Sequence, residues 1–332
     1  IDAFYKGEIP QTMVSAAHAG PDGGTLTVED IASYEVIERP VICGSFRTMK
    51  ICTTSPPSSG VAQIMIPELY DHLSTGSSNQ ADKVAAFVDA QRLAYADRDH
   101  FIGDPEAIDI PVDDLIDPRY LEYRAGERFA PDQPPTHGDP GLVLRGEPMA
   151  ALLGDDLTVE ASGTTHLSII DQEGNATSMT ATIEGAFGSS RWAHGFLLNN
   201  EMTDFARQPP ADGAKVANAI SPGKRPRSSM SPTMVFDASD DILMITGSPG
   251  GNSIPAYVAK SIIGVLDWGL SAQQAVDHPN IIARGEKVRV EIATDAGKAI
   301  ALDLQERGYQ VQEREGENSG LHVILVRPDG LE

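Results

Sequence analysis

The feature that most constrains this chain is a predicted β-hairpin around residues 164–184. Two strand-like runs, 164–170 and 175–184, flank the turn signal Asp171-Gln172-Glu173-Gly174-Asn175. A three-residue loop with Gly174 in the left-handed position would join them. Counting outward from Asp171 and Asn175 then places Thr164 opposite Thr182. Opposed residues have Cβ atoms roughly 4.5–5.5 Å apart, so the two hydroxyls would lie within hydrogen-bonding reach unless a bulge shifts the register.

This threonine pair has a chemical and a structural interpretation. Threonine is a weak nucleophile that becomes useful when its own free amino group acts as the base, which would require a cut just before Thr164. The structural alternative is that Thr is a good strand former and Thr–Thr pairs stabilise sheets. The predicted face of the second strand leaves room for a ligand or for closely packed backbone, because it carries only the small residues Ala176, Ser178, Thr180 and Thr182. His166, two positions from Thr164, is predicted to be a packed strand residue and not a base.

The charge of the chain excludes some partners. Acidic residues outnumber basic ones 48 to 25 in the 332 residues, which gives a net charge of -23. Such a surface repels nucleic acid and anionic membranes, and we expect neither as a partner. We interpret the acidity as serving solubility or a salty habitat in preference to an acidic binding role. No apolar run approaches the length of a membrane span, and no signal peptide is visible.

The cysteines and histidines suggest no metal site. Cys43 and Cys52 flank a predicted turn at 46–49 between two short strands, and we expect two reduced, packed thiols although a cross-strand contact is open. None of the eight histidines forms an HExxH motif or a metal-ligand pair with nearby carboxylates. We therefore expect no metal and no cofactor.

The order of the predicted elements indicates an α+β fold. Helices are predicted over 1–20, 27–34, 60–72, 82–100, 254–268 and 296–307, and the second begins with a capping-box pattern from Thr27 to Asp30. Strands are predicted over 36–45, 48–54, 164–170, 175–184, 233–237, 241–247, 309–313 and 321–327. The stretch 104–162 is rich in Asp, Pro and Gly, with short helical pieces, and is typical of a surface linker. Helices followed by strands fit a layered domain with an antiparallel sheet.

Three further segments have residues suited to chemistry. Gly247-Ser248-Pro249-Gly250-Gly251 follows a strand and precedes a helix, where backbone N–H groups can stabilise an oxyanion, although such a turn is more often structural. Glu201 and Asp204 lie three residues apart beside apolar residues and could hold an ammonium group or be two solvated acids. The run Lys224–Thr233 has hydroxyls suited to a carboxylate, and its cations could serve only as internal ion-pair partners.

Together these segments resemble the γ-glutamyltransferase (γ-glutamyltranspeptidase) family of N-terminal-nucleophile hydrolases. The matching words span nearly the whole chain in order: Phe4–Ile9, Pro56–Gly60, Ala94–Arg98, Gly103–Pro105, Thr164–His166, Thr180–Thr182, Leu197–Phe205, Lys224–Thr233 and Gly247–Gly251. The resemblance implies an αββα four-layer sandwich, made as a precursor that cuts itself between Gly163 and Thr164. Residues 1–163 would form the mainly helical C-terminal part of a large subunit, and 164–332 a small catalytic subunit.

The resemblance also implies a role for each site residue. Thr164 is expected to be the nucleophile and, through its freed amine, the general base, while Thr182 orients the hydroxyl. The amides of Gly250 and Gly251 would form the oxyanion hole. The carboxylates Glu201 and Asp204 would bind the α-ammonium of a γ-glutamyl donor, and Ser228 and Ser229 its α-carboxylate. The acyl group would pass to Thr164 and then to water or to an amino-acid or peptide acceptor.

Three departures from the family pattern accompany these expectations. A long N-terminal segment, with an Arg that pairs with the donor carboxylate, is expected to be missing, and the usual C-terminal extension is cut short. Glu184 stands where many members have Asn, which adds a third acid near the donor. The stretch Ala206–Gly223 is short for a lid loop and predicts a more open site.

Two alternatives follow. One is an acylase for another dicarboxylate amide, such as a glutaryl-cephalosporin, using the same Thr164, although glutaryl donors lack an α-ammonium. The other is a catalytically inert, unprocessed fragment. By family analogy the protein is periplasmic or secreted, and a cytoplasmic location is open.

Overall fold

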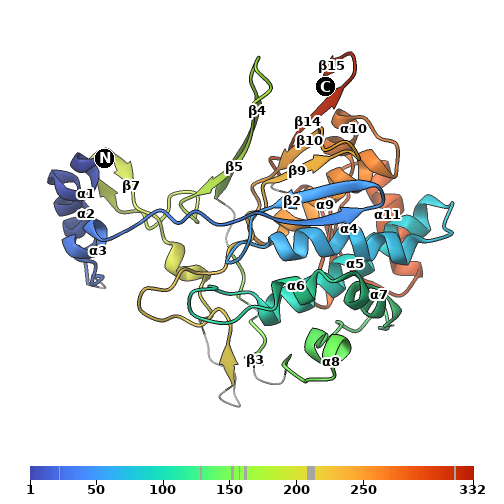
Figure 1. Cartoon of the computed structure of the whole chain (residues 1–332), viewed down its shortest axis with the longest axis horizontal. Coiled ribbons are helices and arrows are strands. Elements are labelled where there is room, and N and C mark those ends of the chain that lie inside the picture. Colours follow the sequence, from blue (N-terminus) through green and yellow to red (C-terminus); the bar gives the residue numbers. More distant parts are fainter. Residues whose placement is uncertain are drawn as a thin grey trace.

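The centre of the molecule is a six-stranded sheet. The computed structural model describes residues 1–21, 23–127, 129–150, 153–156, 158–160, 163–207, 214–317 and 319–332. Neighbouring strands are antiparallel and follow the order β1-β2-β9-β10-β14-β15 (Figure 1). Their bounds are β1 Ile42–Phe46, β2 Met49–Thr53, β9 Thr233–Phe236, β10 Ile242–Gly247, β14 His322–Arg327 and β15 Gly330–Leu331.

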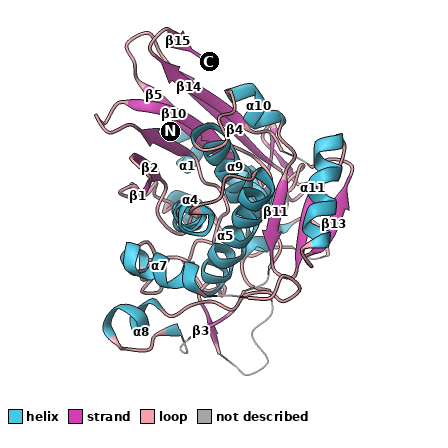
Figure 2. Cartoon of the chain, turned by 90° about the vertical axis from the view of Figure 1, so that its right-hand side faces the viewer, coloured by secondary structure: helices cyan, strands magenta, loops and turns pink. Residues whose placement is uncertain are grey.

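Two long helices, α4 (Gly60–Ser74) and α9 (Ile254–Leu266), pack against one face of this sheet. A third, α5 (Gln80–Phe101), packs against α4 and against β11 (Ile281–Arg284) of a smaller sheet (Figure 2). Asn79 caps α5 by accepting a hydrogen bond from the Ala81 backbone N–H. Large apolar side chains such as Ile51, Phe87 and Ile262 are fully buried in the core that the sheet and the helices share. Removing this apolar surface from water is the main stabilising contribution at the interface.

The hairpin β4 (Thr164–Ile170) and β5 (Ala176–Thr182) lies on the opposite face, over β10 and β14. Its register pairs Thr164 with Thr182, as the turn count predicts. The contact is close because the facing residues are small: Ser178 Oγ donates to the Thr246 carbonyl at 3.2 Å, and a Cβ added to Gly247 would lie 2.1 Å from the His166 ring. The other face of the hairpin is open, with Ile169 53% and Met179 49% exposed. The small-residue face therefore serves close packing.

Smaller units surround these layers. Strands β11 (Ile281–Arg284), β12 (Lys287–Glu291) and β13 (Gln310–Arg314) form a second sheet, and α11 (Asp295–Glu306) makes the crossover between the parallel β12 and β13. The short N-terminal helices pack beside β6 and β7, apart from the main body in Figure 1. The remaining elements are α1 Asp2–Lys6, α2 Glu8–His18, α3 Val28–Ala32, α6 Val112–Leu115, α7 Pro118–Gly126, α8 Pro140–Arg145, α10 Ala272–Asp277, β3 Leu153–Gly154, β6 Trp192–Ala193, β7 Phe196–Leu197, β8 Lys215–Val216, η2 Glu201–Asp204 and η3 Gly251–Ser253.

The fold belongs to the α+β class, as predicted, with a helical layer, a sheet and a hairpin stacked in that order. The four-layer αββα sandwich that the family resemblance implies stays a prediction. Within the described ranges, the exposed outer face of the hairpin has no covering helical layer. No helix in these ranges is long and apolar enough to cross a membrane.

The expectation of reduced thiols is wrong: Cys43 and Cys52 form a disulfide. The two residues are directly opposed in the β1–β2 register, with Cα atoms 4.1 Å apart. This cross-strand proximity lets the thiols bond. The predicted turn at 46–49 is consistent with this register, but the sequence did not show that the two thiols are oxidised.

Candidate active site

The two threonines at the open end of the hairpin are hydrogen-bonded to each other. Thr164 Oγ1 donates to Thr182 Oγ1 over 3.3 Å. Thr182 Oγ1 also accepts from the Glu184 backbone N–H at 2.9 Å, which fixes its position. Both side chains share the face that carries His166, the face that packs toward the central sheet. Thr164 is therefore oriented by a partner that is itself held.

The residue before Thr164 is enclosed by backbone. A Cβ added to Gly163 would lie 2.1 Å from the Glu184 carbonyl oxygen and 2.7 Å from the Ala186 nitrogen. Backbone atoms cannot move aside as a flexible side chain can, so this position requires glycine. The peptide between Gly163 and Thr164 is thus pressed against the segment that follows β5.

His166 is a packed strand residue, as predicted. Its side chain is buried, Nδ1 lies 2.8 Å from Thr180 Oγ1, and Nε2 lies 3.0 Å from Ser168 Oγ. Burial, together with the nearby His322, lowers the pKa of His166 to about 4. The ring is neutral at pH 7 and occupies the space above Gly247.

The glycine loop after β10 begins next to the threonine pair. Because His166 covers Gly247 and Ser178 reaches Thr246, the Thr164 end of β4 extends toward the residues that follow β10. Gly250 and Gly251 have φ values of 138° and 54°, in the region that glycine adopts without strain. Such a turn can expose successive backbone N–H groups toward a developing negative charge.

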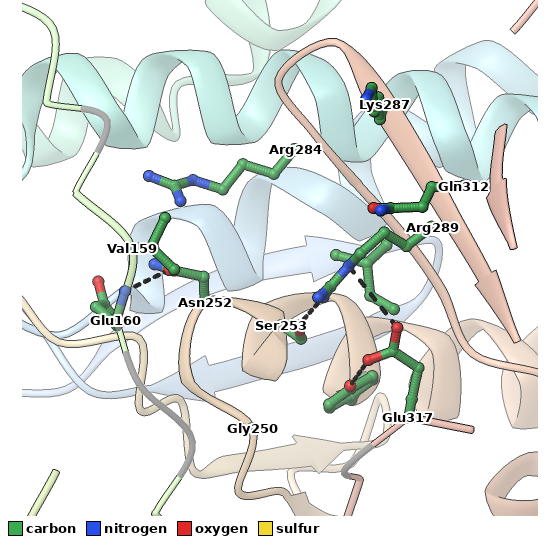
Figure 3. Close-up of a pocket in the computed structure, with 12 residues that line it drawn as sticks. Val159, Glu160, Gly250, Asn252, Ser253, Arg284, Lys287, Arg289, Gln312 and Glu317 are labelled. Carbon is green, nitrogen blue, oxygen red and sulfur yellow. Dashed lines mark hydrogen bonds and ion pairs between the residues drawn. The ribbon is translucent and has the colours of Figure 1, made fainter. Parts of the chain in front are cut away.

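A cavity of about 360 Å³ adjoins this loop. Glu160, Gly250 and Asn252 line one wall, and the Glu160 backbone N–H donates to Asn252 Oδ1 at 2.6 Å (Figure 3). Arg284 and Arg289 also line the cavity. Both are already paired, Arg284 with Asp99 at 2.7 Å and Arg289 with Glu317 at 3.7 Å, so the cavity wall carries charges of both signs.

Three carboxylates gather where the chain leaves β5. One oxygen from each of Glu184, Glu201 and Asp204 lies within 4.8 Å of the others, and Glu184 and Asp204 are buried. Burial, reinforced by neighbouring carboxylates, raises the pKa of Glu201 to about 7 and that of Asp204 to about 9. Three carboxylates this close together repel one another unless they hold protons or face a cation. The site is thus suited to an ammonium group.

Ser228 and Ser229, which are predicted to bind the donor's α-carboxylate, lie against another part of the chain. The Ser229 backbone N–H donates to Glu160 Oε2 at 3.0 Å, and Arg98 Nη2 contacts Glu160 Oε1 at 2.6 Å and Ser229 Oγ at 2.5 Å. Ser228 lies beside them, with its Oγ accepting from the Met230 backbone N–H. Although burial opposes it, the guanidinium groups of Arg98 and Arg227 hold the pKa of Glu160 below its usual value.

Arg98 and Glu160 are the residues of this cluster that sequence reasoning missed. Arg98 lies in the family motif Ala94–Arg98, which could have identified it as a site residue. Nothing in the sequence relates it to Glu160, 62 positions away. The cations of 224–227 prove to have internal partners: Lys224 donates to the Ala217 and Ala219 carbonyls, and buried Arg227 pairs with Asp156 at 3.1 Å.

The structure bears on the expected absence of a metal and on the predicted short lid. The expectation of no metal contrasts with two groups of potential ligands, the three carboxylates above and the set His100, His137 and Asp155. The short lid predicted at Ala206–Gly223 includes residues 208–213, which lie outside the described ranges.

Comparison with known proteins identifies the family of the chain and several relatives. The family model described as Gamma-glutamyltranspeptidase matches residues 1–332. The chain is 33% identical to the Glutathione hydrolase proenzyme of Escherichia coli (strain K12), over 99% of this chain and 56% of the relative. Identity to the Glutathione hydrolase proenzyme of Pseudomonas sp. (strain A14) is 37%, over 84% and 47%. The Acylase ACY 1 proenzyme of Pseudomonas sp. (strain SE83) is 30% identical, over 99% and 55%. The chain spans about half the length of these curated relatives.

Among solved structures, the cephalosporin acylase from Bacillus halodurans is similar with a TM-score of 0.82. The match covers 99% of this chain and 56% of that chain at 22% sequence identity. The likeness shows a shared fold.

Proposed function

Because the chain belongs to the γ-glutamyltranspeptidase family, we propose that it is a γ-glutamyl amide hydrolase and transferase with Thr164 as its nucleophile. The observation that carries the proposal is the hydrogen bond from Thr164 Oγ1 to Thr182 Oγ1 at the start of β4. An N-terminal threonine needs a partner that orients its hydroxyl, and Thr182 supplies one.

The first step of the proposal is self-cleavage. Thr164 Oγ attacks the Gly163 carbonyl carbon, the peptide C–N bond breaks, and an ester forms while the Thr164 nitrogen becomes a free amine. Water then hydrolyses the ester, leaving a carboxylate on Gly163 and a free hydroxyl on Thr164. The backbone pressed around Gly163 supports this step, because it holds the scissile carbonyl in one position. The products are two paired pieces, 1–163 and 164–332.

Turnover then uses the freed amine. Its reference pKa, about 7.7–8.0, suits a general base at neutral pH. The amine accepts the Thr164 hydroxyl proton as Oγ attacks the γ-glutamyl carbonyl, and the backbone N–H groups of Gly250 and Gly251 stabilise the oxyanion. The proton passes to the leaving amine. Water or the amino group of an acceptor then attacks the acyl-enzyme and releases Thr164.

The donor's α-amino acid group is recognised by two clusters. Its ammonium meets Glu184, Glu201 and Asp204, whose mutual repulsion it relieves. Its carboxylate meets Ser228 and Ser229. Because Glu160 already bonds the Ser229 backbone N–H in the uncut chain, the donor can take this position only when Glu160 leaves it. Arg98 would then be available to pair with the donor carboxylate.

The second candidate is an acylase for another dicarboxylate amide, a reading favoured by the 30% identity to the Acylase ACY 1 proenzyme. A glutaryl group has no ammonium to place among these carboxylates, so the γ-glutamyl proposal is preferred. The test compares hydrolysis of γ-glutamyl and glutaryl anilides by the purified protein. Faster cleavage of the glutaryl substrate would refute the γ-glutamyl proposal. A single uncut band near 35 kDa on a denaturing gel, without turnover, would favour the inert fragment.

A further inference from the structure

Two imidazoles and a carboxylate meet at the C-terminal end of α5, and none of the three has been assigned a role above. His100 is the penultimate residue of α5, His137 lies in the loop before α8, and Asp155 follows β3. One ligand atom from each lies within 4.8 Å of the other two. His100 is buried, while the Asp155 side chain is 55% exposed. The group thus joins three separate segments at a place that solvent can reach.

Backbone carbonyls fix the tautomers of both imidazoles. His100 Nε2 lies 2.8 Å from the Ala150 carbonyl oxygen, and His137 Nδ1 lies 2.9 Å from the Gly138 carbonyl oxygen. A carbonyl oxygen only accepts hydrogen bonds, so each of these nitrogens carries the proton. The lone pairs left over are on His100 Nδ1 and His137 Nε2. Histidines that bind metals commonly have this arrangement, in which the ring nitrogen that does not bind the metal donates a hydrogen bond to a carbonyl.

The lone pair of His100 Nδ1 faces an anion. Nδ1 lies 2.7 Å from Asp155 Oδ1, and two acceptors at that distance repel unless a positive centre stands between them. The His137 ring stacks on His100 with centroids 3.5 Å apart and ring planes inclined by 23°, and one of its nitrogens lies within 4.8 Å of the other two ligand atoms. Because the lone pairs of stacked rings are nearly parallel, the His137 ring must turn before it can share an ion with His100. Either a proton or a metal ion could be the positive centre, and the third ligand distinguishes the two because a proton needs only one donor and one acceptor.

We propose that His100, His137 and Asp155 bind a divalent transition-metal ion of the zinc type. Two imidazoles and a carboxylate are ligands that suit Zn²⁺, with water completing the coordination. Bonds of about 2.05 Å at tetrahedral angles need an N···O separation of about 3.3 Å. The 2.7 Å contact must therefore open slightly, and the exposed Asp155 carboxylate can make that movement. The metal would tie the 153–156 segment, which leads toward Gly163, to the end of α5.

The test is zinc binding to the purified, metal-stripped chain, without any affinity tag of histidines. Isothermal titration should show one Zn²⁺ per chain, and zinc should raise the melting temperature. His137→Gln and Asp155→Asn should each weaken binding at least tenfold and remove the thermal shift. Cobalt(II) should give a d–d absorption band in the unsubstituted chain and lose it in both variants. These two positions are chosen because His100 is buried and its replacement could prevent folding.

Matched variants separate this site from other zinc ligands. His72→Gln, on the exposed side of α4, should leave binding unchanged. Zinc that is lost in Asp204→Asn and retained in His137→Gln would be held by the three carboxylates and would overturn the proposal. The proposal would also be overturned if zinc did not bind stoichiometrically and nitrogen-15 spectra showed His100 as an imidazolium paired with Asp155.

Discussion

Thr182 Oγ1 lies between two groups, accepting one hydrogen bond from Thr164 Oγ1 at 3.3 Å and another from the Glu184 backbone N–H at 2.9 Å. The same residue that orients the proposed nucleophile is thereby linked to the first of the three clustered carboxylates. Glu184 has a φ of 71°, an uncommon value for a residue with a side chain. This local conformation turns the chain after β5 so that the proposed nucleophile and the proposed ammonium site adjoin.

Replacing the proposed nucleophile tests both steps of the chemistry. Thr164→Ala should leave one uncut chain and reduce turnover of a γ-glutamyl anilide by at least about 10³-fold, because the hydroxyl is absent. Thr164→Ser keeps a hydroxyl and should still be cut. Mass spectrometry of the pieces measures the cut site. Cleavage before residue 164 in Thr164→Ala would contradict the mechanism.

The close packing at Gly163 predicts slow processing when a side chain is added. In Gly163→Ala the new methyl group meets the Glu184 carbonyl oxygen at 2.1 Å, which displaces the scissile peptide. Because misplacement by about 1 Å can cost 10²-fold in rate, we expect cleavage to slow by that order. Gly126→Ala, with no atom within 4 Å of its new Cβ, is the matched control. Equal processing half-lives for the two variants, followed on gels, would contradict the prediction.

The ion pair between Arg98 and Glu160 should stabilise the uncut chain. In the Thr164→Ala background, Glu160→Gln leaves Arg98 buried without its closest carboxylate and should lower the free energy of unfolding by about 3 kcal/mol. Asp295→Asn removes an exposed pair with Lys298 and should have little effect. Urea unfolding measures both. A Glu160→Gln variant as stable as its parent would show that the pair contributes nothing.

Local patterns predicted much of this structure, while contacts between distant segments were not predictable. The register of Thr164 against Thr182 followed from one turn, and the capping box of Thr27 and Asp30 followed from spacing, because each involves neighbouring residues. The predicted turn at 46–49 left a contact between Cys43 and Cys52 open, but the sequence did not show that the thiols form a disulfide. The strands β11 and β12 went unrecognised although their sequences are rich in Val and Ile. Nothing in either local sequence indicates that Arg98 meets Glu160.

Donor binding should depend on pH through the three carboxylates. Protons on Glu201 and Asp204, whose pKa values are raised to about 7 and about 9, compete with an incoming ammonium. The Michaelis constant for a γ-glutamyl anilide should therefore fall several-fold as pH rises from 6 to 8.5. A glutaryl anilide has no ammonium and should not show this decrease. Parallel pH profiles for the two substrates would argue against the ammonium site.

The same carboxylates should cost stability at high pH when no donor is bound. Their folded-state pKa values lie above the value of about 4 for unfolded carboxyls. Between pH 4 and 9 the folded chain thus holds protons that the unfolded chain releases, and the free energy of unfolding from this cluster falls as pH rises. Asp204→Asn removes the group with the most raised pKa. In the Thr164→Ala background it should melt a few degrees higher than its parent at pH 8 and at nearly the same temperature at pH 5. Asp240→Asn, an exposed position, controls for the loss of one charge. Lower stability of Asp204→Asn at pH 8 would mean that the Asp204 carboxylate is stabilised as an anion, contrary to the repulsion on which the ammonium site rests.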